Sequence, residues 1–167
     1  MKRFILVIPV IIFPYIVAIP PLLMFYTSLT DMPIVDLPYL CVSYLFALGC
    51  SAASIAVGLK KGWDAREMLR ISRLVKLLHI PAYILIFFSG FISVASLFFA
   101  PFAFILYVLN CLTIFTSGLL GVGGIVRGVK EGQISKKTAV AHGVLQFIFC
   151  VDVVSSVVLY RRVKKRV

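Results

Sequence analysis

Asp152 is the residue of this chain that is best placed to do chemistry. It is the only charged side chain between Lys137 and Arg161, in a stretch that is otherwise mostly apolar. A carboxylate at the centre of a bilayer costs about 2.5 kcal/mol or more, so such a group usually faces protein or water and marks an ion path, a proton path or a buried contact. The polar groups that could meet Asp152 are therefore the first candidates for a functional site.

Three further polar side chains belong to this predicted intramembrane site: Asn110, His142 and Gln146. His142 and Gln146 are one helical turn apart and share a face. Counted from the predicted outer surface at about 1.5 Å per residue, Asn110 lies at a depth similar to that of Asp152, and we expect it to donate a hydrogen bond to the carboxylate. The set could be a structural clamp, a proton relay or cation site, or a contact with a partner subunit.

Other catalytic chemistry has little support in the sequence. The four cysteines include no Cys-x-x-Cys pair, and the two histidines, His79 and His142, are far from the spacing of a zinc motif. Nucleophile elbows and paired acidic motifs for phosphate chemistry are also missing. We therefore predict no catalytic residue, no metal site and no cofactor, and we expect that the protein is not an enzyme.

The elements that must position these residues are predicted from four long apolar runs. Hydrophobic residues make up 62% of the chain and its mean hydropathy is +1.09, well above the ~45–50% apolar share of soluble domains. A helix needs about 20 apolar residues to cross the ~30 Å hydrocarbon layer. Because the runs are continuous rather than alternating, they predict helices and not a barrel. The runs cover residues 4–30, 37–59, 77–126 and 138–160.

The predicted fold is an all-α, polytopic membrane helical bundle that forms a single integral membrane domain over residues 1–167. The third run is long enough for two passages, which gives five transmembrane helices. The prolines of the first run predict a kinked helix there, and small residues spaced four apart predict close helix packing. The expected spans cover residues 4–29, 38–59, 79–99, 101–125 and 139–160.

The net charge of +11 predicts orientation rather than nucleic-acid binding, because cytoplasmic loops of membrane proteins accumulate Lys and Arg. The N-terminus is then cytoplasmic, in a cell membrane, and the acidic loop with Asp31 and Asp36 is outside. A fifth span would leave the basic tail, residues 161–166, outside, against this preference. Three explanations stay open: a true fifth span, a re-entrant or surface-lying last helix, or a different path for the first run.

Residues 65–78 predict a short amphipathic helix at the membrane interface. Its basic face consists of Arg66, Arg70, Arg73 and Lys76, spaced four, three and three apart. Such a face can bind anionic lipid headgroups or dock a cytosolic partner. We expect Trp63 to anchor this helix at the interface and Pro81 to kink its passage into the next span.

These patterns favour association over catalysis or transport. We expect a non-catalytic multi-pass membrane protein, an accessory or partner-binding subunit of a membrane complex. The alternative is a bundle that transports or binds a small solute or ion through Asp152. The expected partners are the lipid bilayer, including anionic lipids, and a membrane protein or a second copy of the chain.

Overall fold

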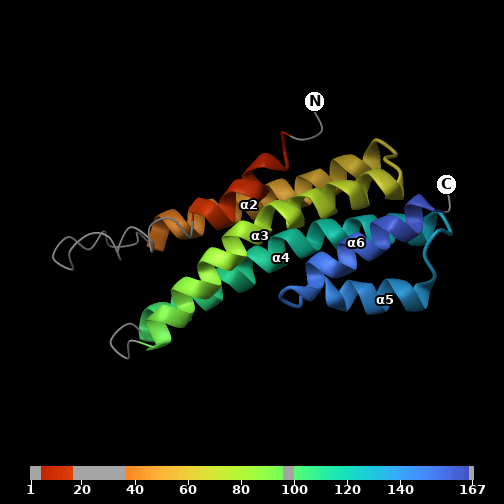
Figure 1. Cartoon of the computed structure of the whole chain (residues 1–167). Helices are drawn as coiled ribbons and strands as arrows, with labels where there is room; N and C mark the ends of the chain where they lie inside the picture. The colour runs from red at the N-terminus through yellow and green to blue at the C-terminus, as the bar shows by residue number, and fades with distance from the viewer. Residues whose placement is uncertain (1–4, 17–36, 96–99, 166–167) are drawn as a thin grey trace.

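A computed structural model describes residues 5–16, 37–95 and 100–165 of the chain (Figure 1). Within those ranges all regular secondary structure is helical, which confirms the predicted all-α class for the described part. Residues 8–16 are helical. The other helices are α2 (Leu37–Lys60), α3 (Ala65–Ala95), α4 (Ala100–Lys130), α5 (Lys136–Leu145) and α6 (Val151–Lys164).

Three of the described helices, α2, α3 and α4, are long and apolar enough to cross a membrane. With 24, 31 and 31 residues, they extend roughly 36 to 46 Å, compared with a hydrocarbon layer of ~30 Å. They run back and forth side by side in Figure 1. They correspond to the predicted spans over 38–59, 79–99 and 101–125, with α3 and α4 extending further towards the basic loops.

The predicted continuous helix over residues 139–160 is wrong, and the five-span count is not confirmed. The structure has two short helices there, α5 and α6, separated by a turn over residues 146–150. With 10 and 14 residues, they extend only about 15 and 21 Å. Figure 1 shows them folded into a hairpin against the other helices. Most of the first predicted span, over 4–29, lies outside the described residues.

Residues 65–78 are the first half of α3 rather than a separate interfacial helix. The helix continues past Pro81 without interruption. Its buried side packs closely on α4, where a Cβ on Gly124 would lie only 3.2 Å from the backbone nitrogen of Leu69. The predicted use of small residues for close packing is confirmed at this position, and the contact draws this half of α3 into the bundle.

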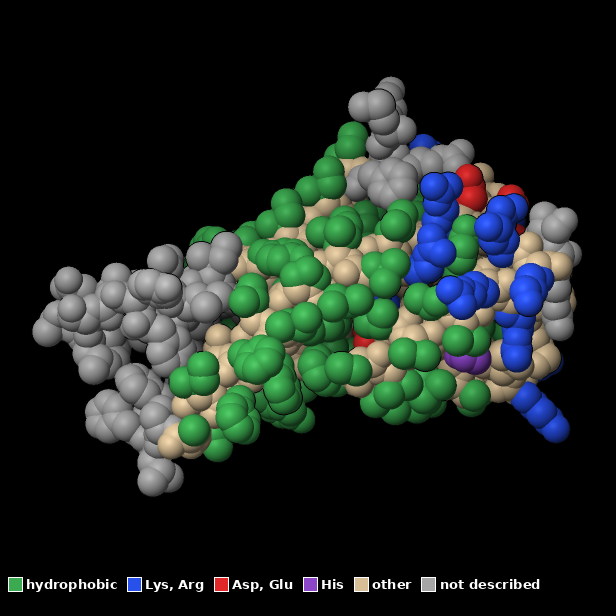
Figure 2. Space-filling view, viewed as in Figure 1, with side chains coloured by type: hydrophobic (Ala, Val, Ile, Leu, Met, Phe, Trp, Pro, Cys, Tyr) green, Lys and Arg blue, Asp and Glu red, His purple; other side chains and the backbone are tan. Residues whose placement is uncertain are grey.

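At the basic end of the molecule, the carboxylate of Glu131 links the end of α4 to the start of α3. Glu131, just after α4, accepts hydrogen bonds from the backbone N–H of Ala65 at 3.3 and 3.2 Å and from Nε of Arg127 at 2.6 Å. It therefore satisfies the N–H of the first residue of α3, one of the helical N–H groups that lack a partner within the helix. Figure 2 shows that Lys and Arg side chains gather at this end, where the α2–α3 turn, the α4–α5 connection and the end of α6 meet.

The first helical segment crosses the faces of α2, α3 and α4. Val7 and Val10 are buried in a cluster with Trp63, Val75 and other apolar residues, and Phe13 packs in a second cluster nearer the opposite end. Trp63 is only 6% exposed, so it is a core residue. The expectation that it anchors the protein at the interface is wrong.

Candidate functional site

Asp152 forms a fully buried ion pair with Lys76. Nζ of Lys76 lies 3.0 Å from Oδ2 of Asp152, and both side chains have 0% exposure. The sequence prediction assigned Lys76 to a lipid- or partner-facing basic surface. The structure instead turns it inwards, because the first half of α3 packs against the C-terminal hairpin and not flat on the membrane.

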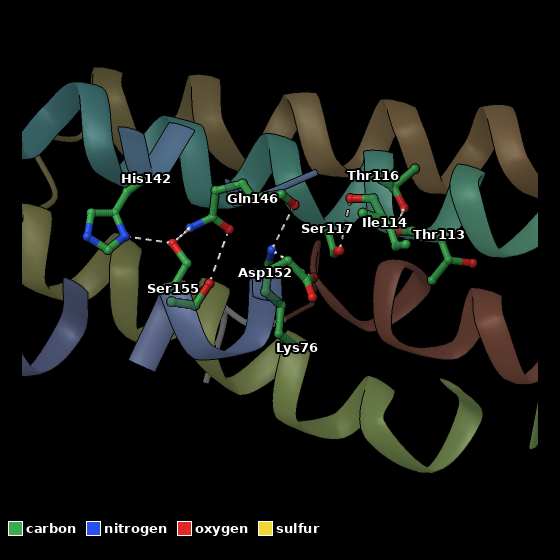
Figure 3. Close-up of polar contacts among 10 residues, drawn as sticks. Lys76, Thr113, Ile114, Thr116, Ser117, His142, Gln146, Asp152 and Ser155 are labelled. Carbon is green, nitrogen blue, oxygen red and sulfur yellow. Dashed lines mark hydrogen bonds and ion pairs between the residues drawn. The ribbon is translucent and has the colours of Figure 1, made fainter. Parts of the chain in front are cut away.

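This ion pair joins the two ends of the break between α5 and α6 (Figure 3). Lys76 also donates from Nζ to the backbone carbonyl of Gln146 at 3.3 Å, directly after α5 ends. Asp152 is in the first turn of α6. A cation at the C-terminal end of one helix and an anion at the N-terminal end of the next both suit the helix dipoles. The pair thus supports the carbonyl of Gln146 at the start of the turn, while the N–H groups of Phe147 and Ile148 donate to carbonyls of α5.

The side chain of Gln146 fixes the hairpin from within. Its Oε1 accepts from the hydroxyl of Ser156 at 3.1 Å, and its Nε2 donates to the hydroxyl of Ser155 at 3.4 Å. Ser155 also forms a 2.8 Å hydrogen bond with Nδ1 of His142. The structure therefore brings His142, Gln146 and Asp152 into one cluster, as Figure 3 shows.

Asn110 is not part of this cluster. Its Oδ1 has no hydrogen-bond partner among the described residues, and the hydrogen bond expected between Asn110 and Asp152 is not formed. The depth count placed Asp152 on a continuous helix descending from the outer surface. A hairpin that turns at residues 146–150 changes the position of Asp152, and Lys76 takes the place predicted for the amide.

Two glycines of α4 make room for the turn. A Cβ on Gly118 would lie 3.0 Å from the backbone oxygen of Gln146. A Cβ on Gly121 would overlap the side-chain amide of Gln146. These glycines let the hairpin turn rest directly on the helix, and a larger residue at either position would push Gln146 away from Lys76.

The remaining basic residues of the predicted face have different surroundings. Arg70 is exposed, whereas Arg66 and Arg73 are partly buried. Cζ of Arg73 lies 4.0 Å from the ring centroid of Tyr160 on α6, a cation–π contact. Arg73 therefore helps to hold the hairpin near the basic end.

The sequence prediction missed a buried polar stripe on α3. Ser72, Lys76, His79 and Tyr83 follow one another at steps of four, three and four, and all four are buried, on one helical face. Nε2 of His79 forms a 3.0 Å hydrogen bond with the carbonyl of Val10, so the stripe also holds the first helical segment. The spacing of this stripe can be read from the sequence, but Lys76 also fits the spacing of the three arginines of the predicted basic face equally well.

His142 is only partly buried, whereas Gln146 and Asp152 of the same cluster are buried. Partial burial lowers the pKa of the His142 imidazole below 6.5, and the positive charge of Arg162 lowers it further. Within the described residues, no group of three or more His, Cys, Asp and Glu side chains could hold a metal ion.

Comparison with known proteins gives a family and no activity. Residues 1–165 match the model of a family described as "Family of unknown function (DUF6652)". Neither the curated proteins nor the solved structures include a significant match.

Proposed function

Because the chain belongs to this family of unknown function, we propose its role from the geometry: a non-catalytic, multi-pass membrane protein that acts by binding a partner membrane protein. The observation that carries the proposal is the closed Lys76–Asp152 pair. Both charges are fully buried and are directed at each other and at the hairpin turn. The buried charges of Lys76 and Asp152 thus hold helices together, and we infer that the functional contacts are made by the outer surface.

The outer face of α2 has the composition expected of a helix-binding surface. Of the three long helices, α2 is the least buried, and its exposed positions include Gly49, Ala52 and Ala56. A Cβ on Gly49 would meet none of the described atoms within 4 Å. Small residues let another helix approach closely, which compensates in lipid for the missing hydrophobic driving force. The proposed partner therefore contributes an apolar transmembrane helix.

The test of this function is association in lipid. Gly49→Leu should reduce co-purification of a membrane partner, or self-association of the chain measured by energy transfer in liposomes, because a bulky side chain keeps helices apart. Gly90→Leu is the matched control, since a Cβ on Gly90 of α3 also meets open space. If both variants associate as the parent does, or if neither a partner nor a self-associated form exists, the proposal is wrong.

The proposed orientation puts the basic end in the cytoplasm of the cell. The hairpin removes the conflict that a fifth span created, because the end of α6 returns to the side of the α4–α5 connection (Figure 1). Basic residues on both segments then obey the positive-inside preference. Reporter fusions at the C-terminus should report a cytoplasmic location, and a periplasmic or extracellular signal would contradict this orientation.

A transport role is the second candidate, and one observation favours it. Asp152 lies at the junction of two helices too short to cross, and secondary transporters place ion sites at such discontinuous helices. In that case, purified protein in liposomes should show ion-coupled uptake that Asp152→Asn abolishes while the helical content is preserved. Absence of uptake by the parent protein would remove this candidate and favour association.

A further inference from the structure

Several buried polar atoms lack partners around the hairpin turn. Among the described residues, Oδ1 of Asp152 and the hydroxyl oxygen of Tyr83 make no hydrogen bond. Asp152 has 0% exposure and Tyr83 4%. A buried polar group without a partner costs about 1–3 kcal/mol, and native proteins usually satisfy such groups with protein or ordered water. Two such atoms beside one turn require an explanation.

The two groups approach the same place from different helices. The ring of Tyr83 packs edge-on against Phe149 in the hairpin turn, with centroids 5.4 Å apart, and Asp152 follows three residues later. Tyr83 also interacts electrostatically with Asp152, and its hydroxyl lies close to the Ser117 side chain of α4, although the two do not meet the geometry of a hydrogen bond. The Ser117 hydroxyl donates to the carbonyl of Ile114 at 3.2 Å, so its oxygen can still accept.

We propose that Tyr83, Ser117 and Asp152 bind a water molecule between α3, α4 and α6. The water accepts a hydrogen bond from the Tyr83 hydroxyl and donates to Oδ1 of Asp152 and to the Ser117 oxygen. Three hydrogen bonds are typical of a buried water. Oδ2 of Asp152 stays with Lys76, so the water completes the carboxylate without competing with the ion pair.

This site makes Asp152 a hydrated carboxylate in contact with exchangeable protons. Lys76 of α3 contacts Asp152 directly, and Tyr83 of α3 interacts with it electrostatically. Ser117 of α4 and Cys150 of the turn lie near Tyr83, and His79 lies near Lys76. Because Lys76 already balances the charge of Asp152, the site suits a neutral protic molecule better than a metal cation. The inference goes beyond the proposed function and holds for either candidate role.

Removal of one hydroxyl tests the water directly. Tyr83→Phe deletes only the phenolic oxygen. If that oxygen binds water, its loss should reduce the folding equilibrium constant about fivefold, the effect of roughly 1 kcal/mol. If the oxygen is dry and unpartnered, the same variant should be as stable as the parent or more stable, and the proposal fails. Ser117→Ala should behave like Tyr83→Phe.

A matched control separates this effect from the general cost of deleting a buried hydroxyl. Thr113→Val on α4 removes a fully buried hydroxyl that bonds to the carbonyl of Leu109 of its own helix at 2.9 Å. It should change the equilibrium constant less than Tyr83→Phe does. Equal losses in the two variants would mean that the Tyr83 effect is not evidence of water, and would overturn the proposal.

Magnetic resonance in lipid gives a second readout. In full-length protein with labelled aspartate, magnetisation should pass from water to the carboxyl carbon whose signal disappears in Asp152→Asn. Tyr83→Phe should weaken that transfer while the signal itself remains. A carboxyl signal that receives no magnetisation from water in the parent protein would show a dry site.

Discussion

Two of the turns between the described helices, the α2–α3 turn and the α5–α6 turn, differ in the groups that support their backbones. The α2–α3 turn, residues 61–64, is polar and lies among the basic residues, with Gly62 at φ 66°. The α5–α6 turn, residues 146–150, is mostly apolar and has a non-glycine residue, Cys150, at φ 63°. In the first turn, the N–H groups of Lys61, Gly62 and Trp63 donate to carbonyls of α2. In the second, the carbonyl of Gln146 accepts a hydrogen bond from Lys76 on another helix.

This difference shows what a turn needs where its surroundings are apolar. Unsatisfied backbone groups cost several kcal/mol in the hydrocarbon region, so irregular backbone survives there only where protein or enclosed water supports it. The α5–α6 turn is supported by a buried cation, a carboxylate and two glycines. Its stability should therefore depend on the buried ion pair and the two glycines, whereas the charged side chain of Lys61 in the α2–α3 turn is exposed.

Breaking the ion pair should have the largest effect. Lys76→Met or Asp152→Leu leaves one buried charge without its partner, and each should lower the free energy of unfolding in mixed micelles by about 3–5 kcal/mol. The double variant should recover most of that loss, because no unpaired charge remains. Lys61→Ala, in the polar turn, is the control and should change little. Single variants that are as stable as the parent would mean that the pair does not support the apolar turn.

Filling the space beneath the turn should have the next largest effect. Gly121→Ala forces its Cβ into the Gln146 amide and should cost about 1–3 kcal/mol of unfolding free energy, as overpacking usually does. Gly90→Ala meets open space and should stabilise α3 by up to ~1 kcal/mol through helix propensity. The same unfolding measurement checks both, and equal effects would contradict the close contact between α4 and the turn.

Substitution of the positive-φ residue should change stability in opposite directions in the two turns, and by less than the changes above. Cys150→Gly relieves a conformation that L residues rarely adopt and should stabilise the protein by about 1 kcal/mol. Gly62→Ala introduces the same strain into the polar turn and should destabilise by about 1 kcal/mol. Thermal unfolding of both variants gives the signs. A destabilising Cys150→Gly would show that the thiol contributes more than its backbone strain costs.

The smallest expected effect is the pH dependence from His142. Because its pKa in the folded protein is below 6.5, the unfolded chain binds more protons in the window just below pH 6.5. Stability should therefore be highest above pH 6.5 and fall as the pH drops through that window. Thermal unfolding as a function of pH should show a shallower decline for His142→Gln than for the parent. Identical profiles would mean that protonation of the His142 imidazole does not affect the stability of the protein.

The sequence alone determined the helical class and the three long apolar helices. Charge segregation and run length are local properties, and a bilayer of fixed thickness converts them into helices almost without reference to tertiary contacts. The sequence also singled out Asp152, His142 and Gln146, because polar residues in an apolar run are visible without a structure. For the same reason it expected helix from 139 to 160, since composition does not distinguish one long helix from two short ones.

Only the tertiary structure decided the hairpin and the partner of Asp152. The turn at 146–150 is possible because Lys76, Gly118 and Gly121 lie opposite it, and all three come from distant parts of the chain. Lys76 fits two helical faces equally well by spacing, one with the arginines and one with Ser72, His79 and Tyr83. Packing of α3 against α4 and the hairpin selects the second face. A buried Asp152 carboxylate without Lys76 as its partner would cost far more free energy than exposure of the Lys76 side chain would gain.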